Sequence, residues 1–195
     1  TDTVRLVGET NEALLSGVET VTGSDGSDSI TINTNDIEVV SGGDGFDAVT
    51  LTDASGNTVD LDGVETVMGS DGADTLTVTD DTSATLDGGL GADTLFGGSG
   101  DDTLIGGGGA DVVDGGEGAD LLELDGSVGV TAEGGGGTDT VELVGETNEA
   151  SLSGVETVMG SDGSDSITIN TNDIEVVSGG DGFDAVTLTD ASGNT

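Results

Sequence analysis

The sequence of 195 residues contains no cysteine, histidine, lysine, proline, tryptophan or tyrosine. Without cysteine there are no disulfides and no thiol chemistry. Without histidine or cysteine, zinc and copper sites are disfavoured. The chain also offers no nucleophile–base set, so we expect that it is not an enzyme. It has no run of about 20 apolar residues, so we expect no membrane insertion.

Positive charge is almost absent, because Arg5 stands alone against 41 acidic residues and the net charge is −40. Repulsion of this size opposes a compact chain in plain water. It also argues against nucleic acid or anionic lipid as a partner. Such a composition usually indicates disorder. The alternative is a fold completed by bound cations, with an expanded chain in their absence.

Glycine, by contrast, is abundant, with 38 residues that recur at fixed offsets from aspartate. Residues 88–123 read as four consecutive nonapeptides, GGLGADTLF, GGSGDDTLI, GGGGADVVD and GGEGADLLE. Each fits the pattern G-G-x-G-x-D-x-U-x, in which U is a large aliphatic residue. The glycines predict a six-residue turn that ends at Asp93, and Leu95 is then the inward residue of a short strand, because side chains alternate along β structure.

Two nonapeptides predict one flattened coil of about 18 residues, stacked on the next coil by parallel pairing. Each turn then lies over the turn two nonapeptides later, which places Asp93 over Asp111 and Asp102 over Asp120. Carboxylate and carbonyl oxygens of two stacked turns can surround one ion, and such an all-oxygen set suits Ca²⁺ better than Mg²⁺. The sequence therefore predicts an all-β parallel solenoid whose folding is coupled to calcium.

A long internal repeat extends this organisation over the whole chain. Residues 1–58 recur as residues 138–195 with three differences, which are Arg5 to Glu142, Leu14 to Ser151 and Thr22 to Met159. We predict one continuous solenoid over 1–195, made of a 137-residue unit at 1–137 and a partial second copy at 138–195. Both ends interrupt a motif, so we expect the sequence to be a window on a longer array.

Related turns begin at Gly23, Gly42, Gly69, Gly134, Gly160 and Gly179, and in those at 23, 69 and 160 serine replaces the second glycine. The shorter spacing, as from Gly23 to Gly42, predicts one whole coil with a plain turn at its other edge. The longer spacing, from Gly42 to Gly69 and from Gly134 to Gly160, predicts one and a half coils. The second copy then begins 15 half-coils after the first and faces the opposite edge. A single enlarged, three-sided coil at the longer spacings is the alternative.

The strands predict a thin, dry seam between two sheets. Glu19, Glu65 and Glu156, each between valine and threonine, are expected to face solvent. Outward threonines such as Thr75 and Thr77 fit either an ice-binding face or strand propensity, and we favour propensity because matching rows do not continue from coil to coil. The predicted seam consists of Val21, Ile30, Ile32, Val40, Val49, Leu51, Val67, Leu76, Val78, Leu86, Leu95, Leu104, Val113, Leu122, Leu124, Val141, Leu143, Val158, Ile167, Ile169, Val177, Val186 and Leu188.

The nonapeptides resemble the RTX (repeats-in-toxin) calcium-binding β-roll, strictly over 88–123, well at 42–50, 134–142 and 179–187, and more loosely elsewhere. The resemblance implies a right-handed parallel β-roll in which Ca²⁺ lies between turns, held by the sixth-position aspartate and loop carbonyls. It also implies a secreted, extracellular or cell-surface protein. Each aspartate has an alternative role as a cap of its own turn. The implied ligands are Asp47, Asp93, Asp102, Asp111, Asp120, Asp139 and Asp184, with Asp28, Asp74 and Asp165 in the looser turns.

Three functions fit these features. We favour a calcium-binding structural repeat of a giant secreted or surface protein, such as a filament, surface layer or adhesin stalk, because near-identical copies add length without new chemistry. The alternatives are a calcium-dependent export and folding module of a secreted toxin or hydrolase, and an ice- or ligand-binding solenoid. The expected partners are calcium ions and further copies of the chain, since unpaired end coils favour self-association into a filament or layer.

Overall fold

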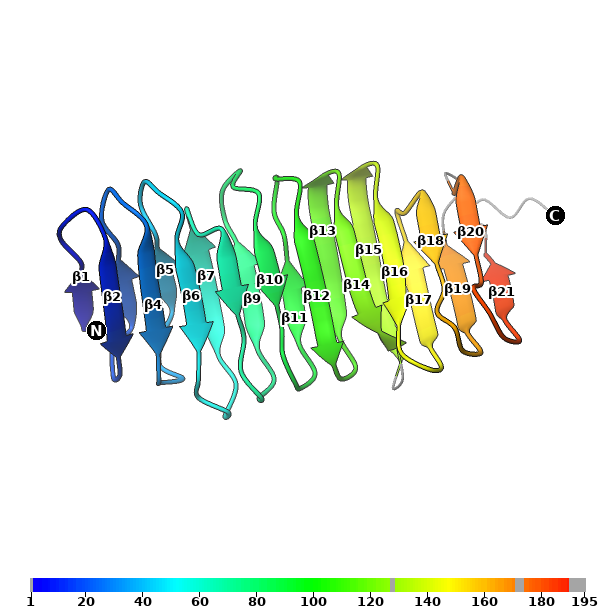
Figure 1. Ribbon diagram of the computed structural model, residues 1–195, viewed down its shortest axis with the longest axis horizontal. Coiled ribbons are helices and arrows are strands. Elements are labelled where there is room, and N and C mark those ends of the chain that lie inside the picture. The colour runs from blue at the N-terminus through cyan, green and yellow to red at the C-terminus, as the bar shows by residue number, and fades with distance from the viewer. Residues whose placement is uncertain (1, 127–128, 171–173, 190–195) are drawn as a thin grey trace.

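A computed structural model describes residues 2–126, 129–170 and 174–189 of the chain. The strands of this part alternate between two sheets, and every pairing is parallel, between one strand and the strand two places later (Figure 1). The predicted all-β parallel solenoid is therefore confirmed. None of the described residues forms a helix long and apolar enough to cross a membrane.

The odd-numbered strands form an 11-stranded sheet, and the even-numbered strands form a 10-stranded sheet. The first sheet contains β1 (Thr3–Arg5), β3 (Thr20–Thr22), β5 (Val39–Ser41), β7 (Thr58–Asp62), β9 (Thr75–Val78), β11 (Thr94–Phe96), β13 (Val112–Gly118), β15 (Val130–Gly137), β17 (Glu149–Ser153), β19 (Ser166–Asn170) and β21 (Ala185–Leu188). The second contains β2 (Asn11–Leu15), β4 (Asp28–Ile32), β6 (Ala48–Leu51), β8 (Thr66–Met68), β10 (Thr85–Asp87), β12 (Thr103–Gly108), β14 (Leu121–Asp125), β16 (Thr140–Val144), β18 (Thr157–Met159) and β20 (Val176–Ser178).

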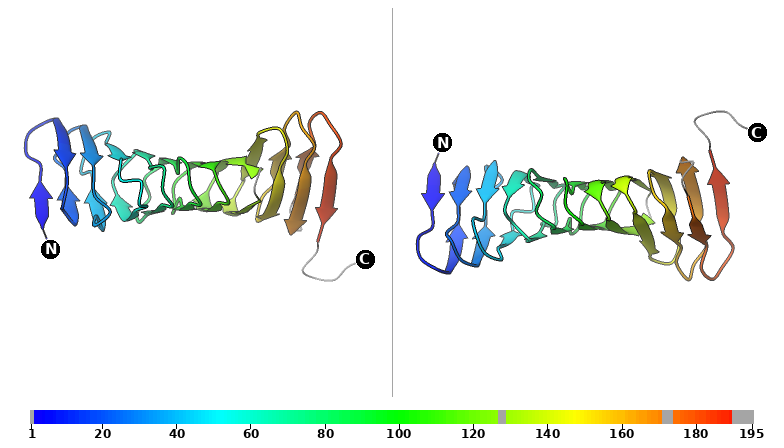
Figure 2. Two further views of the ribbon diagram at one scale, coloured as in Figure 1. Left: turned by 90° about the horizontal axis from the view of Figure 1, so that it is seen from below. Right: turned by 90° about the horizontal axis from the view of Figure 1, so that it is seen from above.

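The coils stack along one long axis, with the two termini at opposite ends of the molecule (Figure 1). The strands at both ends lie nearly in the plane of the two views in Figure 2, whereas the central strands are seen more nearly end-on. The strand direction thus rotates along the axis, as expected for sheets whose strands carry a right-handed twist.

A single narrow core lies between the two sheets, as the aliphatic pattern predicts. Most of the predicted seam residues are buried, and the prediction is wrong at the last coil, where Val177, Val186 and Leu188 are 38, 42 and 62% exposed. These three have no further coil packed over them among the described residues. The sequence analysis missed buried residues in the longer turns and in β7, β15 and β17, which are Val18, Ile37, Val59, Leu61, Val64, Ala84, Val130, Ala132, Ala150, Leu152 and Val155.

The longer spacings between turns are one and a half coils. Between the turns that begin at Gly42 and Gly69, the chain forms β6, β7 and β8, which is three half-coils. The first copy therefore begins with β1 in the 11-stranded sheet, and the second copy begins with β16 in the 10-stranded sheet. The predicted change of edge is confirmed, and the enlarged three-sided coil is not formed.

Rows of outward hydroxyl groups do continue from coil to coil, so the opposite expectation is wrong. Thr58 pairs with Thr75 and Thr75 with Thr94 in one sheet. After Val112, that row resumes with Thr131, Ser151, Thr168 and Thr187. The other sheet aligns Thr66, Thr85 and Thr103, and later Thr140 and Thr157. The rows were missed because the offset between paired residues varies with turn length.

Candidate metal centre

The glycine–aspartate turns stack in columns along the two edges of the solenoid. The Asp93 backbone N–H donates to Asp111 Oδ1 at 2.9 Å, and the Asp102 N–H donates to Asp120 Oδ1 at 2.8 Å. The predicted stacking of these aspartates is therefore confirmed. The Asp120 N–H continues its column by donating to Asp139 Oδ1 at 2.9 Å. One carboxylate oxygen of each aspartate thus holds the preceding coil in register.

The second carboxylate oxygen has a different environment. In the described part of the chain, Oδ2 is buried and without a hydrogen-bond partner in six turns. The six side chains are at most 2% exposed. A buried charged oxygen with no compensating partner costs several kcal/mol, so these atoms require a cation or a proton. They belong to Asp47, Asp93, Asp102, Asp111, Asp120 and Asp139.

Glycine at the first turn position leaves room next to each of these oxygens. A Cβ added to Gly88 would lie 2.6 Å from Asp93 Oδ2 and 2.9 Å from the carbonyl oxygen of Gly106 in the next turn. The corresponding Cβ on Gly97 would lie 2.5 Å from both Asp102 Oδ2 and the Gly115 carbonyl oxygen. A carboxylate oxygen of one turn and a carbonyl oxygen of the next therefore face the same small space, which any larger residue would fill.

The electrostatics of these carboxyl groups reflect their isolation. Burial raises the pKa of Asp93 to about 6 and that of Asp102 to about 6. Burial also raises the pKa of the other four, which are Asp47, Asp111, Asp120 and Asp139. Neighbouring carboxylates act in the same direction at most of these groups, because like charges disfavour ionisation. A bound divalent cation would reverse both effects.

The donor set fits a hard cation. Carboxylate and carbonyl oxygens suit Ca²⁺, which accepts irregular oxygen coordination, better than Mg²⁺, which demands near-octahedral geometry. Among the described residues, no group of three or more histidine, cysteine, aspartate or glutamate side chains is positioned to hold a metal ion. A site in this fold would therefore combine single carboxylates with backbone carbonyls from two stacked turns.

The looser turns place their aspartates differently. Asp28, Asp74 and Asp165 are buried, but serine N–H groups donate to their Oδ2 atoms, at 2.7, 2.7 and 2.8 Å. Burial raises the pKa of Asp28, but hydrogen bonds from Asn11 and Ser24 outweigh it and hold the pKa below its ordinary value. Asp184 is exposed in the last described turn, where its Oδ1 accepts the Asp165 N–H at 3.1 Å.

Two glutamates close columns of turns, a role that the sequence analysis missed. Glu65 Oε2 accepts the Asp47 N–H at 2.6 Å, and Glu156 Oε2 accepts the Asp139 N–H at 2.7 Å. Both are half-buried, so the expectation that they simply face solvent is wrong. Each occupies the place of the next aspartate in its column. The detectable signal was the Gly-Val-Glu segment that follows the column's last aspartate at the distance of one coil along the sequence.

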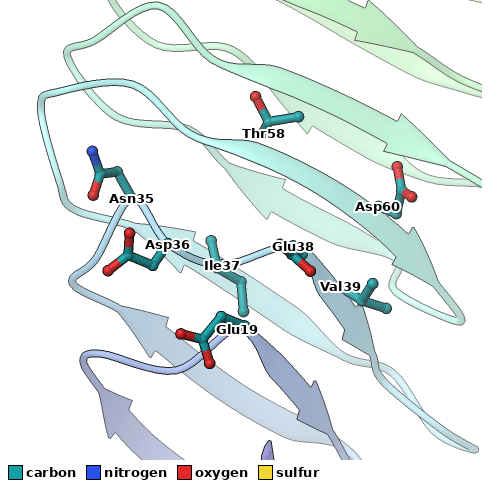
Figure 3. Close-up of a pocket in the computed structure, with 8 residues that line it drawn as sticks. All are labelled: Glu19, Asn35, Asp36, Ile37, Glu38, Val39, Thr58 and Asp60. Atoms are coloured by element: carbon teal, nitrogen blue, oxygen red, sulfur yellow. The ribbon is translucent and has the colours of Figure 1, made fainter. Parts of the chain in front are cut away.

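A separate open hollow of about 730 Å³ lies beside the turn between β4 and β5. Glu19, Asp36, Glu38 and Asp60 line it, with Asp60 on the far side from Asp36 (Figure 3). None of the buried unpaired oxygens of the described residues belongs to this hollow. Its carboxylates are open to water, and it lacks the enclosed oxygens of the stacked turns.

Comparison with known families agrees with the turn geometry. Residues 61–81 and 87–122 match the RTX calcium-binding nonapeptide repeat, in four copies. This segment is an RTX repeat array. The match includes the turns of Asp74, Asp93, Asp102, Asp111 and Asp120. No curated protein and no solved structure matches the chain. The RTX repeats are calcium-binding motifs, and the solenoid extends their coil into both flanks without a break in sheet pairing among the described residues.

Proposed function

We propose that this RTX solenoid is a calcium-stabilised structural repeat of a giant secreted or cell-surface protein. The observation that supports it most directly is the set of six buried, unpaired aspartate oxygens in the stacked turns. In a chain of net charge −40, divalent cations at these positions offset both local and global repulsion. The chain's own part is structural, and we propose no catalytic role.

The residues that would hold calcium are the six aspartates with unpaired Oδ2 atoms, together with carbonyl oxygens of the next turn, such as those of Gly106 and Gly115. Their Oδ1 atoms are already engaged with the preceding coil, so each carboxylate is held in place before the ion arrives. The ion would supply the positive charge that these dry turns lack. Asp184 would join the set when a further coil covers it.

Calcium titration tests this proposal. Isothermal titration of the metal-free chain should show several calcium ions per chain, and circular dichroism should show β structure rising with calcium, because ion binding contributes to the folding free energy. Magnesium at the same concentration should produce a smaller change. No heat of binding, or the same β content in excess chelator, would refute the proposal.

The length-extending role is supported by how the long repeat fits the solenoid. The second copy begins 15 half-coils after the first, so its strands enter the opposite sheets without interrupting either one. Such a unit can be added repeatedly while each sheet simply grows. Many further 137-residue units in the full-length protein would support a stalk, filament or layer, whereas a single adjoining enzyme domain would support an export and folding module. Secretion and self-association remain predictions, and ultracentrifugation in millimolar calcium tests the latter.

The hydroxyl rows support a second candidate, the binding of an ordered surface such as ice. Thr58, Thr75 and Thr94 align on one sheet, and Thr66, Thr85 and Thr103 align on the other. Regular spacing along a rigid sheet is what a repeating surface requires. Thermal hysteresis in calcium, lost on replacement of Thr75 and Thr94 by lysine, would support this candidate. A folded chain without hysteresis would exclude it.

A further inference from the structure

Serine-containing turns in this chain share an arrangement that glycine turns lack. Each contains a serine four residues before the aspartate and receives an asparagine from the preceding coil, at the same sequence separation from the aspartate in every case. The three sets are Asn11–Ser24–Asp28, Asn57–Ser70–Asp74 and Asn148–Ser161–Asp165. The same residue types at the same spacings in three places indicate one repeated device, which we name the amide clamp.

The amide clamp pairs both carboxylate oxygens. In the second set, Asn57 Nδ2 and the Asn57 N–H donate to Asp74 Oδ1 at 2.7 and 2.6 Å, and the Ser70 N–H donates to Oδ2 at 2.7 Å. The Ser70 hydroxyl also donates to Oδ2, at 3.0 Å. The donors of the first and third sets are placed alike. The carboxylate oxygen that would face a metal is therefore already occupied.

Backbone conformation explains why serine closes the turn and glycine opens it. The second glycine of the open turns has a positive φ, for example 92° at Gly89 and 103° at Gly43. Ser24, Ser70 and Ser161 do not, since no described residue other than glycine has a positive φ. With a negative φ, the serine N–H reaches the carboxylate. A left-handed conformation, which favours glycine, leaves Oδ2 without that donor.

We propose that the three amide clamps are metal-free turns, in which asparagine and serine take the place of the cation. This inference rests on the proposed function, because it states which turns of the calcium-binding solenoid take no ion. Asparagine at the first position and serine at the second determine that specificity. It replaces the implied assignment of Asp28, Asp74 and Asp165 as ligands. The one buried oxygen left unpaired in the clamps is Asn57 Oδ1, a single neutral atom.

The clamps also stand in a defined place, directly before an open turn of the same column. The Asp28 N–H donates to Asp47 Oδ1 and the Asp74 N–H to Asp93 Oδ1, both at 2.7 Å. A turn that is complete without metal therefore orients the first carboxylate that needs one. In this arrangement, each clamp provides a pre-formed start for a column of calcium sites.

The test counts calcium ions in the full chain by native mass spectrometry and isothermal titration. Asp93→Asn should lose one ion relative to the wild type, and Asp74→Asn, the matched change in the neighbouring turn of the same column, should lose none. The double variant Asn57→Ala/Ser70→Gly converts GSDGAD to the open pattern GGDGAD, and Ala is what the clamp position holds before Asp102, at Ala84. It should gain one ion.

A second readout needs no metal. In chelator, the Ser70 N–H should stay protected from hydrogen exchange as long as β8 and β9 are paired, because its acceptor is Asp74. Loss of one ion in Asp74→Asn would overturn the inference, as would an unchanged count in a folded Asn57→Ala/Ser70→Gly chain. If the double variant does not fold, the Asp74→Asn and Asp93→Asn pair still decides. A wild-type chain that binds no calcium would overturn the proposed function as well, which distinguishes the two failures.

Discussion

The central nonapeptide segment and the flanking copies share one fold but are stabilised differently. In the centre, β10 to β13 each bury a single large aliphatic residue, and glycine–aspartate turns occupy both edges. In the first copy, β4 buries Ile30 and Ile32, β6 buries Val49 and Leu51, and such turns occupy one edge. The centre therefore has less apolar burial per coil and more buried carboxylates.

The plain turns of the flanks are closed by neutral hydrogen bonds. Thr52 Oγ1 donates to the Ile32 carbonyl at 3.1 Å, and Asn33 Nδ2 donates to Thr52 Oγ1 at 3.0 Å. Four of the six unpaired carboxylate oxygens lie in the central turns instead. The comparison teaches that ion binding and apolar burial substitute for one another along one solenoid, so the dependence on calcium should vary with position.

The largest expected effect is a difference in protection after calcium removal. In excess chelator, amides of β10 to β13 should exchange much faster than those of β4 and β6, because the centre loses its counter-ions and has a thinner core. Hydrogen exchange with mass spectrometry measures both regions in one sample. Equal protection along the chain, with and without calcium, would contradict the comparison.

A core truncation should sharpen the same contrast. Leu95→Ala removes the only large aliphatic side chain buried in β11 and should cost about 2–5 kcal/mol. It should also raise the calcium concentration needed for folding. Ile32→Ala is the matched control, because Ile30 stays buried in the same strand. Calcium titrations followed by circular dichroism compare the two midpoints, and an equal shift in both variants would argue against a thinner centre.

Much of the fold was predictable because its period is written directly in glycine and aspartate. The turn starts indicated the coil, the stacking of Asp93 on Asp111 and the change of edge between the copies. The amide clamp was not predicted, since Asn57 and Asp74 meet only after the coil closes. The outward threonine rows were missed for the same reason, because unequal turns hide the pairing offset. What depends on one turn was readable, and what depends on contact between turns was not.

Acidity should affect the centre and the flank in opposite directions. The pKa of Asp102 is raised by burial to about 6, so its contribution to the stability of the metal-free chain is full below the ordinary value of 3.8 and is lost as the pH rises through 6. Each pKa unit corresponds to about 1.4 kcal/mol. Urea unfolding in chelator should therefore show stability falling between pH 4 and 7, and Asp102→Asn should reduce that slope.

Asp28 is the control for this experiment. Its pKa lies below the ordinary value, so its contribution is present above pH 3.8 and is lost only as the pH falls through the lowered value. Asp28→Asn should therefore lower stability at pH 7 and leave the slope between pH 4 and 7 as it is in the wild type. A slope that Asp28→Asn reduces and Asp102→Asn leaves unchanged would reverse the assignment.

The smallest expected effect concerns the ends of the columns. Glu65→Ala leaves the Asp47 N–H without its acceptor, and the loss of one hydrogen bond to a charged group should cost about 1.5–3 kcal/mol before water compensates at this half-buried site. Glu65→Gln keeps an acceptor oxygen and should recover most of that loss. Thermal unfolding in calcium compares the three chains. Because Glu65 neighbours Asp47 and not the central turns, hydrogen exchange at β10 to β13 should be the same in all three, and a change there would show that the columns are not independent.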